Sequence, residues 1–299
     1  MIVREIMTKQ TNGYFTEENS IDVVIESISD ECEPRLKEVI SVLIRKLHEA
    51  VKELEPTQDE WMKAILFLTK TGHKTDDWRQ EFILLSDILG VSMLVDAINS
   101  RRPNGASENT VLGPFHLADV PSLEMGANIN LDGKGEPMFV SGRILDVEGR
   151  PISGANIDIW QANEDGFYDV QQKGIQPDFN LRGIFTTGDD GRYFFKSAKP
   201  KYYPIPDDGP VGALLVALGR HPYRPAHFHY IIKKKGYQTL TTHLFDPDDA
   251  YIHSDAVFGV KESLMAEFKR IDNTQKIKEH GFNQPYYEVA YDFVLARSR

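Results

Sequence analysis

The apolar positions in the first third of the chain follow helical spacing. Between Arg35 and Leu54 they recur at intervals of three and four residues, with Lys and Glu between them. Thr57 and Glu60 form a capping-box pattern that predicts the start of a second helix, with Gly72 as its stop. The predicted helices cover residues 35–54, 57–72 and 75–90, and residues 91–98 continue or restart the third.

The pattern changes after the Arg-Arg-Pro-Asn-Gly run at residues 101–105. Short β-branched and aromatic runs then alternate with turn signals such as Asp189-Asp190-Gly191. The predicted strands are Phe139–Val147, Ala155–Gln161, Gly183–Thr187, Tyr193–Lys196, Ala213–Leu218, His227–Lys233 and Thr239–Phe245. Many short strands with close turns favour an antiparallel sandwich or barrel. We therefore expect an α+β, mainly β protein, with an N-terminal helical segment (residues 1–105) and an antiparallel β-sandwich domain (residues 106–299).

Composition and charge narrow the possible partners and the cellular location. Lys and Arg number 34 and Asp and Glu 45, so the net charge is 34 − 45 = −11, which disfavours nucleic acid and anionic membrane as partners. The single cysteine, Cys32, excludes an intramolecular disulfide and a cysteine-ligated zinc or iron–sulfur site. It also fits a reducing cytosol. Residues 1–10 contain no apolar signal-peptide region, and no apolar run approaches the roughly 18 residues of a membrane span. A cytoplasmic location is expected.

The clearest candidate for chemistry is the histidine pair in Arg224-Pro225-Ala226-His227-Phe228-His229. Residues two apart on a strand point to the same face, so His227 and His229 would present two imidazoles side by side. Imidazole suits zinc, copper, iron and nickel. A bare His-x-His more often binds no ligand, so the pair alone does not predict a metal.

Further ligands would have to be oxygen donors or other histidines. Tyr168 follows a predicted strand, and Tyr202 and Tyr203 precede a Pro-Ile-Pro run. A phenol with an ordinary pKa of about 10 becomes a phenolate at neutral pH only beside a strongly charged hard cation, and iron(III) does this better than a divalent ion. This reasoning leaves Asp and Glu open as ligands. His116, His221, His243 and His253 are further candidates in the β part, and His280 is not placed. The acidic run at 246–249 is expected to be a solvated turn.

Seven motifs follow one another along the chain. They are Leu-Ser-Asp-Ile-Leu-Gly (85–90), Glu-Asn-Thr-Val-Leu-Gly-Pro-Phe (108–115), Asp-Ile-Trp-Gln-Ala-Asn (158–163), Gly-Phe-Tyr (166–168), Tyr-Pro-Ile-Pro-Asp-Asp-Gly-Pro (203–210), Arg-Pro-Ala-His-Phe-His (224–229) and Leu-Thr-Thr-His (240–243). Together they resemble the intradiol ring-cleavage dioxygenases, and among them the members that cleave hydroxyquinol. The resemblance covers nearly the whole chain. Its specificity lies in the order and spacing of the motifs rather than in any one of them.

The resemblance implies an iron site. Tyr168, Tyr203, His227 and His229 match the four protein ligands of one ferric ion per subunit, with water or hydroxide as a fifth ligand. Tyr168 and His227 would be equatorial, and Tyr203 and His229 axial. Tyr203 would leave the metal and take a proton from the substrate, while Arg224 matches the active-site arginine of the family.

Tyr202 is the nearest competitor of Tyr203. Adjacent residues of a strand face opposite sides, so only one of the two is expected to bind the metal. Tyr203 directly precedes Pro-Ile-Pro, as the family ligand does, and is therefore favoured.

The resemblance also implies a substrate pocket. Its expected wall consists of Leu84, Asp87, Val111, Leu112, Gly113, Pro114, Phe115, Ile205, Pro206, Arg224, His243 and Val257. Asp87 would accept a hydrogen bond from the third hydroxyl of hydroxyquinol, although it could instead be an N-terminal helix charge. His243 stands where relatives that prefer catechol usually carry Gln, and Leu112 stands where some carry Phe. For the apolar members, ordinary core packing is the alternative.

The expected reaction is O2-dependent cleavage of hydroxyquinol to 3-hydroxy-cis,cis-muconate and maleylacetate, within aromatic catabolism. The expected assembly is a homodimer through the N-terminal helices, with a place for a bound phospholipid. Three alternatives stay open. They are a catechol or chlorocatechol 1,2-dioxygenase, an iron(II) site of two histidines and a carboxylate such as Asp246, and a non-enzymatic β-sandwich binding module.

Overall fold

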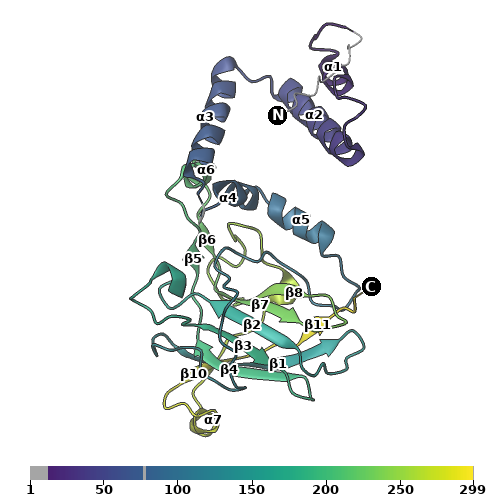
Figure 1. The fold of residues 1–299 in the computed structure, drawn as a ribbon. Coiled ribbons are helices and arrows are strands. Elements are labelled where there is room, and N and C mark those ends of the chain that lie inside the picture. The colour runs from purple at the N-terminus through teal and green to yellow at the C-terminus, as the bar shows by residue number, and fades with distance from the viewer. Residues whose placement is uncertain (1–12, 77–78, 299) are drawn as a thin grey trace, which may run out of the picture. The chain divides into compact units, whose positions relative to one another are not determined.

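The computed structural model describes residues 13–76 and 79–298, and the chain divides into two compact units between residues 69 and 70. The N-terminal ten residues, expected to hold no signal peptide, lie outside the described part. The first unit contains α1 (Ser20–Glu26), α2 (Pro34–Leu54) and most of α3 (Gln58–Lys74) (Figure 1). The helix predicted over residues 35–54 is confirmed. It begins where the Glu33 carboxylate accepts hydrogen bonds from the Arg35 and Leu36 backbone.

The capping box that opens α3 is also confirmed. The Thr57 backbone N–H donates to the Glu60 carboxylate at 2.8 Å, and the Glu60 N–H donates to the Thr57 hydroxyl at 3.2 Å. The helix ends at Lys74, two residues beyond the predicted stop at Gly72.

The second unit begins with the end of α3 and continues through α4 (Glu81–Ile88) and α5 (Val91–Asn99). The helix predicted from near residue 75 starts later than expected, at Glu81. Residues 77–78, which precede it, lie outside the described part. Gly90, at φ +73°, separates the two helices, so the chain restarts rather than continues. These helices belong to the same unit as the sheets, while the domain boundary predicted at residue 105 remains a prediction.

Two sheets form the body of the second unit (Figure 1). The four-stranded sheet is antiparallel, in the order β3 (Arg182–Thr186), β2 (Asn156–Gln161), β7 (His227–Lys233) and β8 (Leu240–Phe245). The other sheet runs β11 (Phe293–Leu295), β1 (Pro137–Asp146), β10 (Tyr286–Ala290) and β9 (Lys269–Ile271), with β4 (Arg192–Ala198) also on β1. The strand β1 pairs in parallel with β10 and β11, the last two strands of the chain. The predicted α+β fold with a β-sandwich is confirmed.

The hydrophobic core lies between the two sheets. On β7 the side chains of Phe228, Tyr230 and Ile232 belong to this core, together with residues of β1 and β4. Because side chains alternate along a strand, His227 and His229 face the opposite side of the four-stranded sheet. One face of β7 therefore packs in the hydrophobic core, and the other face carries the two histidines.

One predicted strand was wrong. The apolar run Ala213–Leu218 forms the second half and the C-cap of a helix, α6 (Pro210–Ala217), and not a strand. Pro210 explains the difference, because proline at the first helical position already has the backbone angle φ of a helix. The Ala and Leu residues that follow it are strong helix formers. A short apolar run without clear periodicity cannot distinguish a buried helix from a buried strand.

The remaining elements are short. They are the two-stranded pair β5 (Tyr203–Pro204) and β6 (Tyr223–Arg224), α7 (Thr274–Glu279), and 3-10 turns at Asp169–Gln171 and Glu262–Leu264. Within residues 13–76 and 79–298, no helix combines the length and the apolar character that crossing a membrane requires.

Candidate metal centre

A buried cluster of histidines and tyrosines lies on the face of the four-stranded sheet opposite the core. His227 and His229 come from β7, and His243 on β8 is paired directly with His229 in the sheet register. Tyr168 follows β2 after a short loop, and Tyr203 begins β5. All five side chains are buried. The fold therefore gathers residues that are far apart in the sequence at one place.

The hydrogen bond of His227 fixes which of its ring nitrogens carries the proton. Its Nδ1 lies 2.7 Å from the Pro225 carbonyl oxygen, which can only accept, so Nδ1 donates and Nε2 keeps a lone pair. Burial lowers the pKa of His227 to about 3 and lowers the pKa of His229 well below its usual value. Both rings are therefore neutral. The Nε2 atoms of the two rings face each other at 3.1 Å.

The two tyrosines complete a set of possible metal donors. The Tyr168 hydroxyl lies 2.9 Å from His229 Nε2, and the rings of Tyr168 and Tyr203 are perpendicular with centroids 5.3 Å apart. Burial raises the pKa of Tyr168 well above its usual value, and Tyr203 adds to the effect. Tyr168 would become a phenolate only if a cation occupied the space that it faces. Phe115 stacks on Tyr168 at 4.6 Å and shields it from water.

Arg224 lies beside this donor set and is held by Asp255. Two guanidinium–carboxylate contacts join them, Nε to Oδ1 at 3.2 Å and Nη2 to Oδ2 at 3.3 Å. Burial opposes both charges. Even so, the ion pair holds the pKa of Arg224 above and that of Asp255 below the usual value. The remaining nitrogen, Nη1, lies 3.4 Å from both the Tyr203 hydroxyl and His227 Nε2. Arg224 thus directs positive charge at the centre.

The residues present fit a metal ion. Two neutral imidazoles and two phenols converge, and a cation among them would relieve the contact between the two Nε2 atoms and neutralise the phenolates. His227, His229 and His243 also satisfy the spacing of a three-histidine site. However, both ring nitrogens of His243 are already engaged, by Thr110 and by His229. Two histidines and two tyrosines, without His243, are therefore the better match for the metal donors.

The structure separates the two competing tyrosines. Tyr203 is buried in the cluster, while the ring of Tyr202 contacts Tyr223 and Tyr251 instead. Asp246, the carboxylate of the alternative iron(II) site, is buried rather than solvated as expected, and it pairs with Lys199 at 2.8 Å. The charge of Asp246 is therefore compensated without a metal.

Some residues of the predicted substrate pocket lie at this centre. A Cβ atom at Gly113 would lie 3.0 Å from His229 Cε1, so the backbone there packs against the ring. Asp87 lies in the last turn of α4. Burial raises the pKa of Asp87, although a hydrogen bond from Ser92 and the charge of Arg224 oppose this. Phe115, Arg224 and His243 are placed as described above. The other members remain predictions: Leu84, Val111, Leu112, Pro114, Ile205, Pro206 and Val257.

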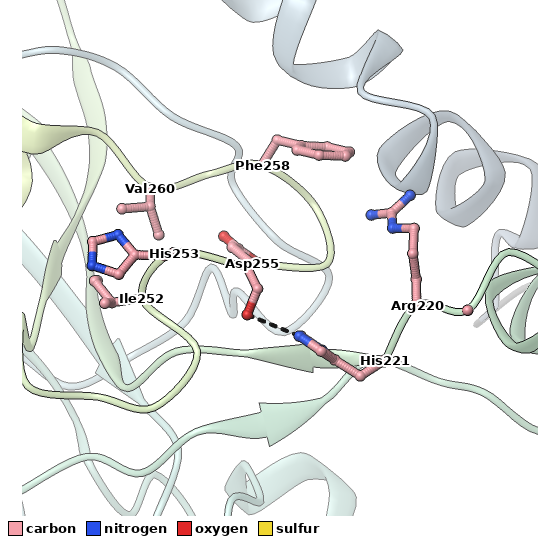
Figure 2. A pocket seen from close by; sticks show the side chains of 9 residues that line it. Arg220, His221, Ile252, His253, Asp255, Phe258 and Val260 are labelled. Carbon is pink, nitrogen blue, oxygen red and sulfur yellow. Dashed lines mark hydrogen bonds between the residues drawn. The ribbon is translucent and has the colours of Figure 1, made fainter.

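A cavity of about 470 Å³ is lined in part by Asp255. Figure 2 shows Arg220 and Phe258 on one side of it, and its dashed line is the 2.9 Å hydrogen bond between His221 and Ser254. Arg220 lies over the Phe258 ring at 4.8 Å. Among the described residues that line it, none belongs to the predicted substrate pocket. We therefore do not assign the substrate to this cavity.

Three residues at the centre were missed by the sequence reasoning. Asp255 holds Arg224, Thr110 contacts His243, and Trp160 stacks on His229 with centroids 4.6 Å apart and ring planes 11° apart. Trp160 and Thr110 lie within motifs of the resemblance, which gave them no role. Asp255 has no local signal, because its partner lies 31 residues away.

Known proteins resemble this chain over most of its length. Residues 33–107 match the family described as "Catechol dioxygenase N terminus", and residues 113–297 match the family described as "Dioxygenase". The chain is 67% identical over 294 residues to a hydroxyquinol 1,2-dioxygenase of Rhizobium sp., covering 98% of this chain and 100% of that protein. It is 46% identical to a 6-chlorohydroxyquinol 1,2-dioxygenase of Cupriavidus pinatubonensis, covering 94% and 98%.

Solved structures show the same likeness. The structure of hydroxyquinol 1,2-dioxygenase from Pseudomonas putida has a TM-score of 0.89 at 45% identity and covers 94% of this chain and 99% of that one. Catechol 1,2-dioxygenase from Acinetobacter radioresistens has a TM-score of 0.83 at 26% identity, with coverage of 96% and 94%.

Proposed function

The chain belongs to the intradiol ring-cleavage dioxygenases, and we propose that it cleaves hydroxyquinol with O2 between two adjacent hydroxyls. The product would be 3-hydroxy-cis,cis-muconate, which tautomerises to maleylacetate. The observation that carries the proposal is the convergence of Tyr168, Tyr203, His227 and His229 beside Arg224. The 67% identity to a hydroxyquinol 1,2-dioxygenase supports the choice of substrate.

We propose that these two tyrosines and two histidines hold one iron(III) per subunit. When bound, the ion supplies Lewis acidity to the diol oxygens and the charge that keeps the phenols ionised. Tyr203 then serves as the base for a substrate hydroxyl, and the proton arrives at its phenolic oxygen. Arg224 Nη1, 3.4 Å from that oxygen, stabilises the negative charge that develops on the deprotonated substrate. Trp160 and Phe115 pack against the ligands and exclude water from them.

Asp87 is the residue that we propose distinguishes hydroxyquinol from catechol. Burial raises the pKa of the Asp87 carboxyl, and the positive charge of Arg224 opposes this effect. A carboxylate that accepts a hydrogen bond from the third hydroxyl is left unpaired when catechol binds. The site should therefore penalise the smaller substrate.

We further propose a cytoplasmic homodimer that assembles through the N-terminal helices and has a place for a phospholipid. Helix α2 supports this, because no residue of it is buried and three of its four leucines are about half exposed: Leu36 52%, Leu43 51% and Leu47 55%. An apolar face of that size is typical of an interaction surface. The single cysteine fits the reducing cytoplasm.

Oxygen uptake by the iron-loaded protein tests the proposed function. Hydroxyquinol and catechol are compared side by side at equal concentration. Rapid uptake with hydroxyquinol and little with catechol is expected. Faster uptake with catechol would be consistent with the iron site but would refute hydroxyquinol as the preferred substrate. No uptake with either substrate would refute the proposed roles of the four ligands.

A further inference from the structure

His243 is a buried histidine whose geometry suggests a task of its own. We propose that His243 is a positioning residue that, together with Thr110, holds His229 in the tautomer whose Nε2 lone pair is available to the metal. The proposal rests on the metal site of the proposed function. It differs from a role as a substrate contact, which the sequence suggested for this position.

The three side chains form a continuous chain of short hydrogen bonds. His229 Nδ1 lies 2.8 Å from His243 Nε2, and His243 Nδ1 lies 2.6 Å from the Thr110 hydroxyl. All three residues are buried, and His243 is completely inaccessible to solvent. Water therefore cannot replace either contact, and each nitrogen depends on the partner that the fold provides.

The direction of the protons follows from counting donors. Two ring nitrogens 2.8 Å apart form a hydrogen bond only when one carries a proton and the other a lone pair, and a neutral imidazole carries a single N–H. If His229 Nδ1 donates to His243 Nε2, then His243 Nδ1 must donate to Thr110. His229 Nε2 is then left with a lone pair. The opposite direction would place a proton on His229 Nε2, where it would block the metal. A metal can therefore bind His229 Nε2 only when the hydrogen bonds run from His229 to His243 and from His243 to Thr110.

The backbone around the chain is built to keep this geometry. His229 and His243 are direct partners in the antiparallel register of β7 and β8. The segment that carries Thr110 is tied to β8, because the Thr110 N–H donates to the Thr241 carbonyl at 2.9 Å and the Thr241 N–H donates to the Asn109 side chain at 2.9 Å. The position of Thr110 relative to His243 is thus set by main-chain contacts.

The His229 ring has little freedom to turn away from this partner. Trp160 stacks on its face, and the Gly113 backbone packs against Cε1. Groups behind a metal-binding histidine fix its tautomer and orientation, and losing them typically costs about 10- to 100-fold in metal affinity. His243 is in the position to serve as such a group.

Two pairs of variants test the proposal in the full-length, iron-loaded protein. In the first pair, His243→Leu removes the acceptor for His229, whereas His243→Gln restores it, because the amide oxygen can accept from His229 and the amide nitrogen can donate to Thr110. In the second pair, Thr110→Val removes the end of the chain. Thr242→Val is its matched control, since it removes a buried hydroxyl on β8 that donates to the Glu108 carbonyl at 2.8 Å and does not contact His243 or His229 through a hydrogen bond in the described part of the chain.

The readouts are iron retention against a competing chelator and the position of the visible tyrosinate–iron absorption band, both without substrate. We expect His243→Leu to lower iron affinity about 10- to 100-fold and to shift the band. Thr110→Val should move both readouts in the same direction by less. His243→Gln and Thr242→Val should stay close to the wild type. Circular dichroism confirms that each variant is folded.

Two outcomes would overturn the proposal. One is a folded His243→Leu protein with the iron affinity and the band of the wild type. The other is a His243→Gln protein as impaired in both readouts as His243→Leu, because the acceptor would then not be what matters. Failure of the proposed function would be seen separately, as a wild-type protein that takes up iron without a tyrosinate band, and it would overturn both proposals.

Discussion

The ion pair between Asp255 and Arg224 allows a sharp test of how the centre is held together. Asp255→Asn keeps the shape of the side chain and an oxygen that can accept from the Gly259 N–H, which the carboxylate binds at 2.9 Å. It removes the charge opposite a guanidinium that is only 3% exposed. Breaking a buried ion pair from one side leaves an uncompensated charge and costs about 3–5 kcal/mol. We expect Asp255→Asn to lower the free energy of unfolding by that amount.

Urea unfolding at pH 7, followed by tryptophan fluorescence, measures this effect. Asp190→Asn is the matched control, because Asp190 pairs with Arg192 at the surface, where both side chains are more than 60% exposed. Its cost should be no more than about 1 kcal/mol. If Asp255→Asn costs as little as the control, the reasoning about the buried pair is wrong. Asp255→Asn should also lower kcat, since Arg224 loses the group that orients it.

The dependence of the same difference on pH has a defined sign. Burial would raise the pKa of Asp255, but Arg224 holds it below its usual value. A carboxyl with a depressed pKa stabilises the fold above its unfolded-state pKa of about 3.9, and that stabilisation is lost as the pH falls through the folded-state value. Wild type and Asp255→Asn should therefore converge in stability below about pH 4. A difference that grows toward acid would contradict this assignment.

Three further variants probe the remaining parts of the site. Asp87→Asn should lower the preference for hydroxyquinol over catechol, measured as the ratio of kcat/KM values, by about tenfold or more, since the third hydroxyl loses a charged acceptor; an unchanged ratio would remove Asp87 from substrate selection. Tyr203→Phe should lower kcat about 10²- to 10⁴-fold through loss of the base and shift the visible band, and near-normal turnover would refute that role. Gly113→Ala should lower the thermal unfolding midpoint, because φ is +77° there and the new Cβ would press on His229; a midpoint equal to the wild type would show that the loop can yield.

The sequence by itself determined the features that depend on local periodicity and on motif order. Two-residue alternation was enough to place His227 and His229 on one face, and helical spacing was enough to locate α2. The order of the motifs pointed to the family. Local signals failed where two structures share one pattern: the apolar run at Ala213–Leu218 fits a buried strand or a buried helix equally well, and Pro210 decided for the helix.

Only the tertiary structure decided which residues support the candidate ligands. Asp255 reaches Arg224 across 31 residues, and Thr110 reaches His243 across 133. The first contact arises where the Ala256 N–H donates to the Tyr223 carbonyl, which brings the segment of Asp255 beside β6. The second arises because the Thr110 N–H donates to the Thr241 carbonyl of β8. The direction of a hydrogen bond between two buried imidazoles depends on what lies behind each ring, and that is a property of packing in three dimensions that no local pattern of residues contains.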